Sequence, residues 1–396
     1  MKLHSILIQL FLLICIVDTF GQNKINFIED EYEKALKQAQ DSSKLLCVFV
    51  YDDDCDHCIN MKKNVLTNQE VIQFYNENFI NLMLNSKTDF CKKFSAKYLL
   101  SGFPSFVFLN TKEEHVYSIA GEVKVKDFLQ ESKLAVNPSN HLPILSKKFF
   151  ADTTNGLNCY AYLNALKRSI EKNKMGDITK KYLYSIPKTS WITTTNWKIM
   201  ALGVNDLYSD EFKFILDYKD AFAQITSLKR VENKILNVIG KQLKYESERI
   251  DTIAYAKTLK FIKNIQVNGK DSLLYLNDLK IYEFSSNWNK YFSNALSGAK
   301  KYSWSDLKTL NEIAVNFYKH NRNKSQVLQA IDMAKRANEL DDSAKSNYLI
   351  AKLYTKVGDK SNALKYAEKS FKIAKETGRD TKEAEVLLKQ LKIGTK

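Results

Sequence analysis

Apolar residues in the first third of the chain alternate between strand-length runs and helical spacing. Residues 44–51 read KLLCVFVY, a continuous apolar run typical of a strand buried on both faces of a sheet. The order of the segments is a βαβ unit, a β-hairpin and a closing helix, which predicts an α/β domain with a central mixed sheet flanked by helices. The other strand-like runs are 79–84, 105–109 and 115–120, and helical spacing covers 26–42, 59–66, 69–78, 90–98 and 125–134.

The rest of the chain has almost only helical periodicity. Apolar residues recur every three or four positions from about residue 145 onward, and 12 Gly and 4 Pro are few for 396 residues. Asn137-Pro138 and Leu142-Pro143 separate this part from the α/β domain. The predicted domains are therefore the α/β domain at 22–136, a helical domain at 145–305 and helical repeats at 306–396.

A weak internal repeat with an offset of 36 residues lies near the C-terminus. Tyr318 aligns with Tyr354 and Val327 with Ala363, and Gly358 falls in a predicted turn. Small residues at such positions let two helices pack closely, and the second copy resembles a tetratricopeptide repeat. Two copies are fewer than the three or so that are stable alone, so we expect this pair to pack on the preceding helices.

The N-terminus has the pattern of an export signal. Lys2 precedes an apolar run over residues 6–17, and Thr19 and Gly21 place small residues where a signal peptidase cleaves. The run is too short for a permanent membrane span, which needs about 20 residues. We therefore expect residues 1–21 to be a signal peptide that is removed before Gln22, and the mature protein to be exported to the periplasm of a bacterial cell envelope without a stable membrane span.

The net charge of +15 is carried by the helical part of the chain. Residues 22–135 contain 14 Lys and 17 Asp plus Glu, so the excess of basic residues follows residue 135. These lysines alternate with acids at helical spacing and no Arg-rich block stands out, which is typical of solvated helix faces. Nucleic acid is therefore not an expected partner.

Two of the five cysteines that follow the signal segment form a Cys-x-x-Cys motif, Cys55 and Cys58, directly after the buried strand. A first thiol at the start of a helix is stabilised as a thiolate, and a second thiol one turn later can form or resolve a disulfide with it. The alternatives are a structural disulfide or half of a zinc site, but zinc needs four ligands and no second close pair is present. We expect no metal or cofactor. Cys47 and Cys159 fit buried positions, and Cys91 is either buried or a second resolving thiol.

Residues 27–135 resemble a thioredoxin-family domain of the exported bacterial type. The matching segments are KLLCVFVY, the CDHC motif, Met61, NFINLML and above all Lys97-Tyr98 followed by Gly102-Phe103-Pro104-Ser105. The resemblance implies that Pro104 is cis and faces the cysteines, and that the backbone of Phe103 pairs with a substrate peptide. It also implies that Gly121 is the late glycine of the family.

The sequence departs from the family pattern at the positions that tune the cysteines. Asp54 replaces the usual Trp, and Phe49 replaces the buried Asp that accepts a proton from the second cysteine. Asp56 and His57 lie between the cysteines, and a His at this position resembles the disulfide-donating oxidases of the periplasm. His57 is either such a tuning residue or a solvated loop residue, and the carboxylates of residues 52–54 act in the opposite direction by raising a thiol pKa, or simply cap the helix.

Two functions are compatible with this sequence. The first is an exported thiol-disulfide oxidoreductase that acts on protein thiols and disulfides, with an unidentified redox partner and a helical part that binds a further protein. The second is a non-catalytic binding or scaffold protein that uses the helical part and retains a vestigial thioredoxin-like domain. The direction of electron flow is open.

Overall fold

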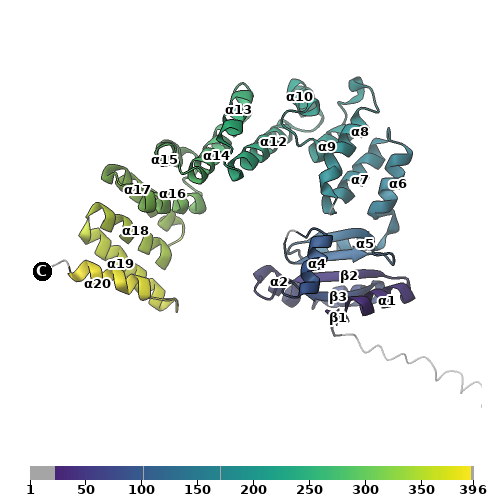
Figure 1. Cartoon of the computed structure of the whole chain (residues 1–396), viewed down its shortest axis with the longest axis horizontal. Helices are drawn as coiled ribbons and strands as arrows, with labels where there is room; N and C mark the ends of the chain where they lie inside the picture. Colours follow the sequence, from purple (N-terminus) through teal and green to yellow (C-terminus); the bar gives the residue numbers. More distant parts are fainter. Residues whose placement is uncertain (1–22, 101, 170, 394–396) are drawn as a thin grey trace, which may run out of the picture. The chain divides into compact units, whose positions relative to one another are not determined.

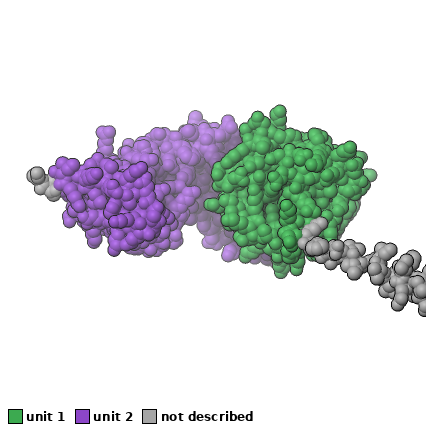
Figure 2. Space-filling model, turned by 90° about the horizontal axis from the view of Figure 1, so that it is seen from below, with its two compact units in different colours: residues 1–205 green, residues 206–396 purple. Residues whose placement is uncertain are grey.

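The structure is a computed structural model that describes residues 23–100, 102–169 and 171–393 (Figure 1). The chain divides into two compact units, Met1–Asn205 and Asp206–Lys396 (Figure 2). The predicted signal peptide at 1–21 lies outside the described residues. The predicted domain limits at 136, 145 and 305 stay predictions.

A five-stranded mixed sheet forms the centre of the first unit, with the strand order β1-β3-β2-β4-β5. The central strand β2 pairs in parallel with β3 and antiparallel with β4, and β1 and β5 form the edges. The fold class predicted from the sequence is thereby confirmed. The strands are Phe27–Glu29 (β1), Leu45–Tyr51 (β2), Phe79–Asn85 (β3), Ser105–Leu109 (β4) and His115–Ala120 (β5).

Helices cover both faces of this sheet because the side chains of β2 alternate between two apolar layers. Leu46, Val48 and Val50 pack with α1 (Tyr32–Ser42) and α4 (Asp89–Lys97) on one face. On the opposite face, Cys47 and Phe49 pack with α3 (Gln69–Asn78) and α5 (Val125–Val136). All five of these β2 side chains are fully buried, which explains why the strand is apolar without a break.

Two helices predicted from periodicity have different limits in the structure. The helix expected over residues 26–42 begins at Tyr32, because Phe27–Glu29 pairs in parallel with β3 as a short edge strand. Asp30 then has a φ of +54°, which separates the strand from the helix. The helix after the cysteine motif starts as α2 (Asp56–Asn60) and continues as a π-helical turn over Met61–Val65.

The remainder of the described chain is helical, as predicted. Four helices complete the first unit, and α6 and α7 pack against β5. The first-unit helices are Leu142–Ala151 (α6), Gly156–Arg168 (α7), Met175–Leu183 (α8) and Thr194–Gly203 (α9). Those of the second unit are Asp210–Asp217 (α10), Lys219–Ile225 (α11), Leu228–Glu248 (α12), Thr252–Ile262 (α13), Lys270–Phe284 (α14), Trp288–Tyr302 (α15), Leu307–His320 (α16), Lys324–Leu340 (α17), Ala344–Val357 (α18), Lys360–Glu376 (α19) and Lys382–Ile393 (α20).

The C-terminal repeat corresponds to two helix pairs of equal lengths. α16 and α18 have 14 residues each, and α17 and α19 have 17 each. Val327, Ala334, Ala363 and Ala367 share one buried cluster, so small side chains lie where the helices approach one another. Gly358 ends α18 with a φ of +88°, a conformation that favours glycine. The tetratricopeptide-like character of this region stays a prediction.

Within the described residues, no helix combines the length and apolar character that a membrane crossing requires.

Candidate active site

The two cysteines of the motif lie where β2 leads into α2. Cys55 is the N-cap residue of α2 in an extended conformation, and its Sγ accepts the backbone N–H of Cys58 at 3.4 Å. Cys55 is partly exposed, whereas Cys58 is fully buried, and both are free thiols. The first thiol is therefore accessible to a partner at the N-terminal end of the helix, and the second lies one turn behind it.

The segment before β4 lies against the first cysteine. The peptide bond between Phe103 and Pro104 is cis, and the Cys55 thiol donates to the Phe103 carbonyl at 3.7 Å. The structure thus brings together residues 48 positions apart, and the backbone of Phe103 lies next to the sulfur atom. Pro104 is buried and Phe103 is partly exposed.

Burial controls the ionisation of Cys58. It raises the pKa of this thiol to about 12, and the neighbouring Cys55 thiol adds to the shift, while the backbone N–H of Asp52 acts in the opposite direction. The position of the family's buried Asp is occupied by Phe49, whose ring stacks on Phe106 with centroids 4.6 Å apart and on Tyr51 with centroids 5.5 Å apart. An aromatic stack therefore lies where the family provides a proton acceptor.

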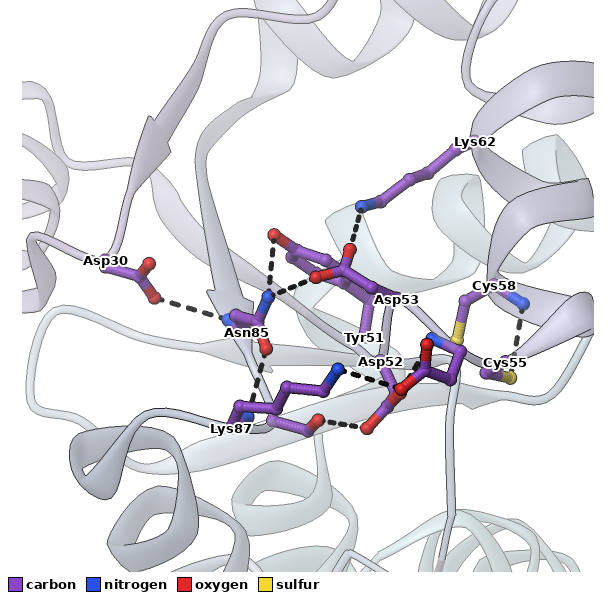
Figure 3. Close-up of polar contacts among 11 residues, drawn as sticks. Asp30, Tyr51, Asp52, Asp53, Cys55, Cys58, Lys62, Asn85 and Lys87 are labelled. Carbon is purple, nitrogen blue, oxygen red and sulfur yellow. Dashed lines mark hydrogen bonds and ion pairs between the residues drawn. The ribbon is translucent and has the colours of Figure 1, made fainter.

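The acidic loop before Cys55 is held by side chains that follow β3 (Figure 3). Asp52 accepts from Ser86 Oγ at 2.5 Å and from the backbone N–H of Asp54 at 2.9 Å, and these hydrogen bonds lower its pKa. The Asp54 carboxylate pairs with Lys87 Nζ at 2.8 Å, which raises the pKa of the lysine. The loop is therefore fixed by direct contacts and its charge is partly neutralised.

The third carboxylate of this loop also has partners. Asp53 accepts from Asn85 Nδ2 at 2.8 Å and lies 3.7 Å from Lys62 Nζ, which is 3.2 Å from the centroid of the Tyr51 ring. Tyr51 and Asn85 are register partners in the parallel strands β2 and β3. Because the carboxyl ends of parallel strands meet at one edge of a sheet, the polar residues after β3 could have been placed here from the sequence.

The His57 side chain contacts Glu122, a residue that the sequence did not single out. Its Nδ1 lies 2.7 Å from Glu122 Oε2, on the loop between β5 and α5. Hydrogen bonds from His57 and from Asn60 lower the pKa of Glu122. Glu122 directly follows Gly121, which has a φ of +81° and donates its N–H to the Pro104 carbonyl at 2.8 Å. Only that neighbouring glycine could have pointed to Glu122 in the sequence.

The remaining cysteines lie in the core. Cys47, Cys91 and Cys159 are fully buried, and burial raises the pKa of each thiol. Cys91 Sγ is 3.9 Å from Ser95 Oγ, in the layer of α1 and α4. Its role as a second resolving thiol stays a prediction. Among the described residues, no group of three or more His, Cys, Asp or Glu side chains could hold a metal ion.

Comparison with known families agrees with this arrangement. Residues 32–135 match the family described as a thioredoxin-like domain. This part of the chain is a thioredoxin-like domain. The match spans the cysteine motif, the Phe103-Pro104 segment and Glu122, and it ends where the helical part begins. No curated protein matches the chain.

Several solved structures align with less than a third of the chain. A thioredoxin from Thermus thermophilus is 25% identical, covers 28% of this chain and 85% of its own, and has a TM-score of 0.26. A protein described as a disulphide isomerase from Bacteroides thetaiotaomicron is 29% identical over 29% of this chain and 95% of its own, with a TM-score of 0.27. The oxidoreductase DsbH is 19% identical, covers 29% of this chain and 87% of its own, and has a TM-score of 0.25.

Proposed function

We propose that this protein is an exported thiol-disulfide oxidoreductase that exchanges disulfides with protein substrates through Cys55 and Cys58. The observation that carries the proposal is the position of the Cys55 thiol, which caps α2 and lies 3.7 Å from the Phe103 carbonyl beside Pro104. Backbone N–H groups at a helix N-terminus stabilise a thiolate, which is the nucleophilic form. The partly exposed Cys55 is accessible to a protein disulfide.

In the reducing direction, the Cys55 thiolate attacks one sulfur of the substrate disulfide. That S–S bond breaks, the second substrate sulfur leaves as a thiolate, and a mixed disulfide joins Cys55 to the substrate. Cys58 then loses its proton and attacks Cys55 Sγ, which releases the first substrate sulfur. Two electrons pass to the substrate and the centre becomes a disulfide; the oxidising direction is the reverse.

The attack of Cys58 on the mixed disulfide should be the slower of the two steps. A thiol with a pKa of about 12 is almost entirely protonated near neutral pH, and Phe49 offers no carboxylate to accept the proton. The thiolate that leaves the substrate in the first step can accept it instead. We therefore expect a mixed disulfide that persists longer than in a centre with a buried acid.

Phe103 and Pro104 are proposed as the peptide-binding segment. The Phe103 carbonyl is directed to the Cys55 sulfur, so an extended substrate segment next to this backbone would place its own sulfur in line with Cys55. Asp54, Asp56 and His57 are proposed to tune the centre, because they flank the two cysteines in sequence. The helical part is proposed to bind a further protein partner, and the site of action is the periplasm.

A second candidate function is a binding protein that works through its helical part and retains an inactive thioredoxin-like domain. The aromatic stack at Phe49 favours this alternative, since it replaces the acid that assists Cys58 in the family.

Trapping of mixed disulfides separates the two candidates. In Cys58→Ser the Cys55 adduct cannot be resolved, so covalent complexes should accumulate on non-reducing gels and disappear with dithiothreitol. Cys91→Ser, which removes another buried thiol, is the matched control and should give no adducts. If Cys58→Ser traps nothing under conditions in which a known oxidoreductase is trapped, the second candidate is favoured. N-terminal sequencing of the exported protein should give Gln22.

A further inference from the structure

Glu122 is held on α2 by two side chains of the same helical segment. Its carboxylate lies 2.7 Å from His57 Nδ1, and Asn60, one turn further along, also donates to it. The His57 and Glu122 side chains are 70% and 39% exposed, so both remain in contact with solvent. The contact links the residue that precedes Cys58 with a segment 65 positions away in the chain.

The backbone on both sides of Glu122 is anchored to the site. Gly121 donates its N–H to the Pro104 carbonyl at 2.8 Å, and the Val123 N–H lies 3.5 Å from Met61 Sδ. The first contact joins the loop to the peptide-binding segment, and the second joins it to the helical segment after Cys58. The carboxylate is therefore positioned by the same elements that form the dithiol site.

The charge of this pair bears on the cysteines. A positive charge near the Cys55 sulfur stabilises the thiolate, which favours the reduced form and makes the couple more oxidising, and a negative charge does the reverse. A protonated His57 alone would thus make the centre a stronger oxidant. The Asp54 carboxylate, directly before Cys55, is already paired with Lys87 Nζ at 2.8 Å, so its charge is partly neutralised.

We infer that Glu122 is a positioning residue of the dithiol centre, which holds the His57 imidazole and offsets its positive charge, and thereby makes the Cys55–Cys58 couple less oxidising. The inference rests on the proposed disulfide chemistry of these two cysteines. Because the His57 and Glu122 side chains are both exposed, solvent screens their charges and we expect a moderate shift.

The test is a redox titration against glutathione with four full-length proteins: wild type, Glu122→Gln, His57→Gln and the double variant. It is run at about pH 6, where an ordinary imidazole is mostly protonated. Glu122→Gln keeps the size of the side chain and removes its charge. We expect this variant to be more oxidising, so that its equilibrium constant with glutathione shifts about three- to tenfold toward oxidised glutathione. In the His57→Gln background, the same Glu122→Gln change should shift the logarithm of the constant by less than half as much. Glu33→Gln, an exposed carboxylate on α1, is the control and should shift it less than twofold.

A role in stability alone would not move the equilibrium constant, so each variant's free energy of unfolding is measured in parallel. The inference is overturned if Glu122→Gln stays within twofold of wild type, or if it shifts the constant equally with and without His57. Failure of the proposed function looks different, because the wild-type protein itself would then form no Cys55–Cys58 disulfide at any glutathione ratio.

Discussion

The thioredoxin-like domain and the second unit are assembled in different ways. In the second unit, one buried cluster joins the consecutive helices α14 to α17, and another joins α16 to α19 around Ala334 and Ala363. In the thioredoxin-like domain, residues 54–57 around the cysteine motif are contacted from three separate segments, which contribute Lys87, Phe103 and Glu122. Architecture can therefore be read from local periodicity, whereas the chemistry of the site depends on contacts between distant segments.

The largest effect is expected when the partly exposed Cys55 thiol is removed. Cys55→Ser should lower disulfide exchange with a protein substrate at least 100-fold, because no other described cysteine combines partial exposure with a helix N-terminus. Cys47→Ser changes a fully buried thiol in the same sheet and should leave the activity within about threefold. Initial rates with a disulfide-bonded protein substrate measure both, and equal losses in the two variants would contradict the assignment.

The second prediction concerns acid stability of the thioredoxin-like domain. Burial lowers the pKa of His115 to about 4, whereas the unfolded chain has a pKa near 6.5. The stability that this neutral imidazole contributes is present above pH 6.5 and is lost as the pH falls to about 4, by up to about 3 kcal/mol. Denaturant unfolding of wild type and His115→Asn from pH 7 to pH 4 measures this loss. A His115→Asn protein that loses stability as steeply as wild type would exclude this histidine as the cause.

The substitution Gly298→Ala changes a residue of the second unit. A Cβ atom at Gly298 would lie 2.3 Å from ring carbons of Tyr275, so Gly298→Ala must displace a buried ring. We expect a loss of about 1–3 kcal/mol in the free energy of unfolding. Ser297→Ala, on the same helix, should cost less than about 0.5 kcal/mol. The glutathione equilibrium of Cys55 and Cys58 should stay unchanged in both variants, and a shift of more than threefold would show that the two regions are coupled.

The smallest effect is expected from the acidic loop. Lys87→Gln leaves the Asp54 carboxylate without its ion pair, and the added negative potential should make the couple about two- to threefold more reducing against glutathione. Lys92→Gln removes an exposed lysine from the Asp89 pair on α4 and is the control. A Lys87→Gln protein that becomes more oxidising would reverse the sign that this electrostatic argument requires.

The sequence allowed the fold of the thioredoxin-like domain to be predicted because its strands carry strong local patterns. β2 is apolar throughout since both faces are buried, and Cys55 and Cys58 follow it directly. Phe27 was assigned to a helix because its spacing to Tyr32 and Ala35 fits helical periodicity, yet it pairs with Asn81 in an edge strand. A strand of three residues is too short for its own period to be recognised.

The surroundings of the cysteine motif could be predicted only in part. Asp54, His57 and Phe103 were named as candidates because they adjoin motif residues in the sequence, and their roles stay predictions. Lys87 and Glu122 were missed because their partners lie 33 and 65 positions away in the sequence. Lys87 could have been placed near Asp54 from the parallel pairing of β2 with β3, whereas a single Glu on the loop after β5 has no pattern of its own. Their partners become visible only when the carboxyl ends of β2 and β3 and the loop after β5 are placed in space.

The central claim is that Cys55 and Cys58 form a reversible disulfide. It is tested most directly by equilibrating the wild-type protein with graded ratios of reduced to oxidised glutathione, alkylating the free thiols and counting them by peptide mass spectrometry. We predict a single two-electron transition in which Cys55 and Cys58 lose reactivity together, while Cys47, Cys91 and Cys159 remain free thiols throughout. Retention of both thiols at every ratio, or a transition in which Cys55 pairs with another cysteine, would contradict the account.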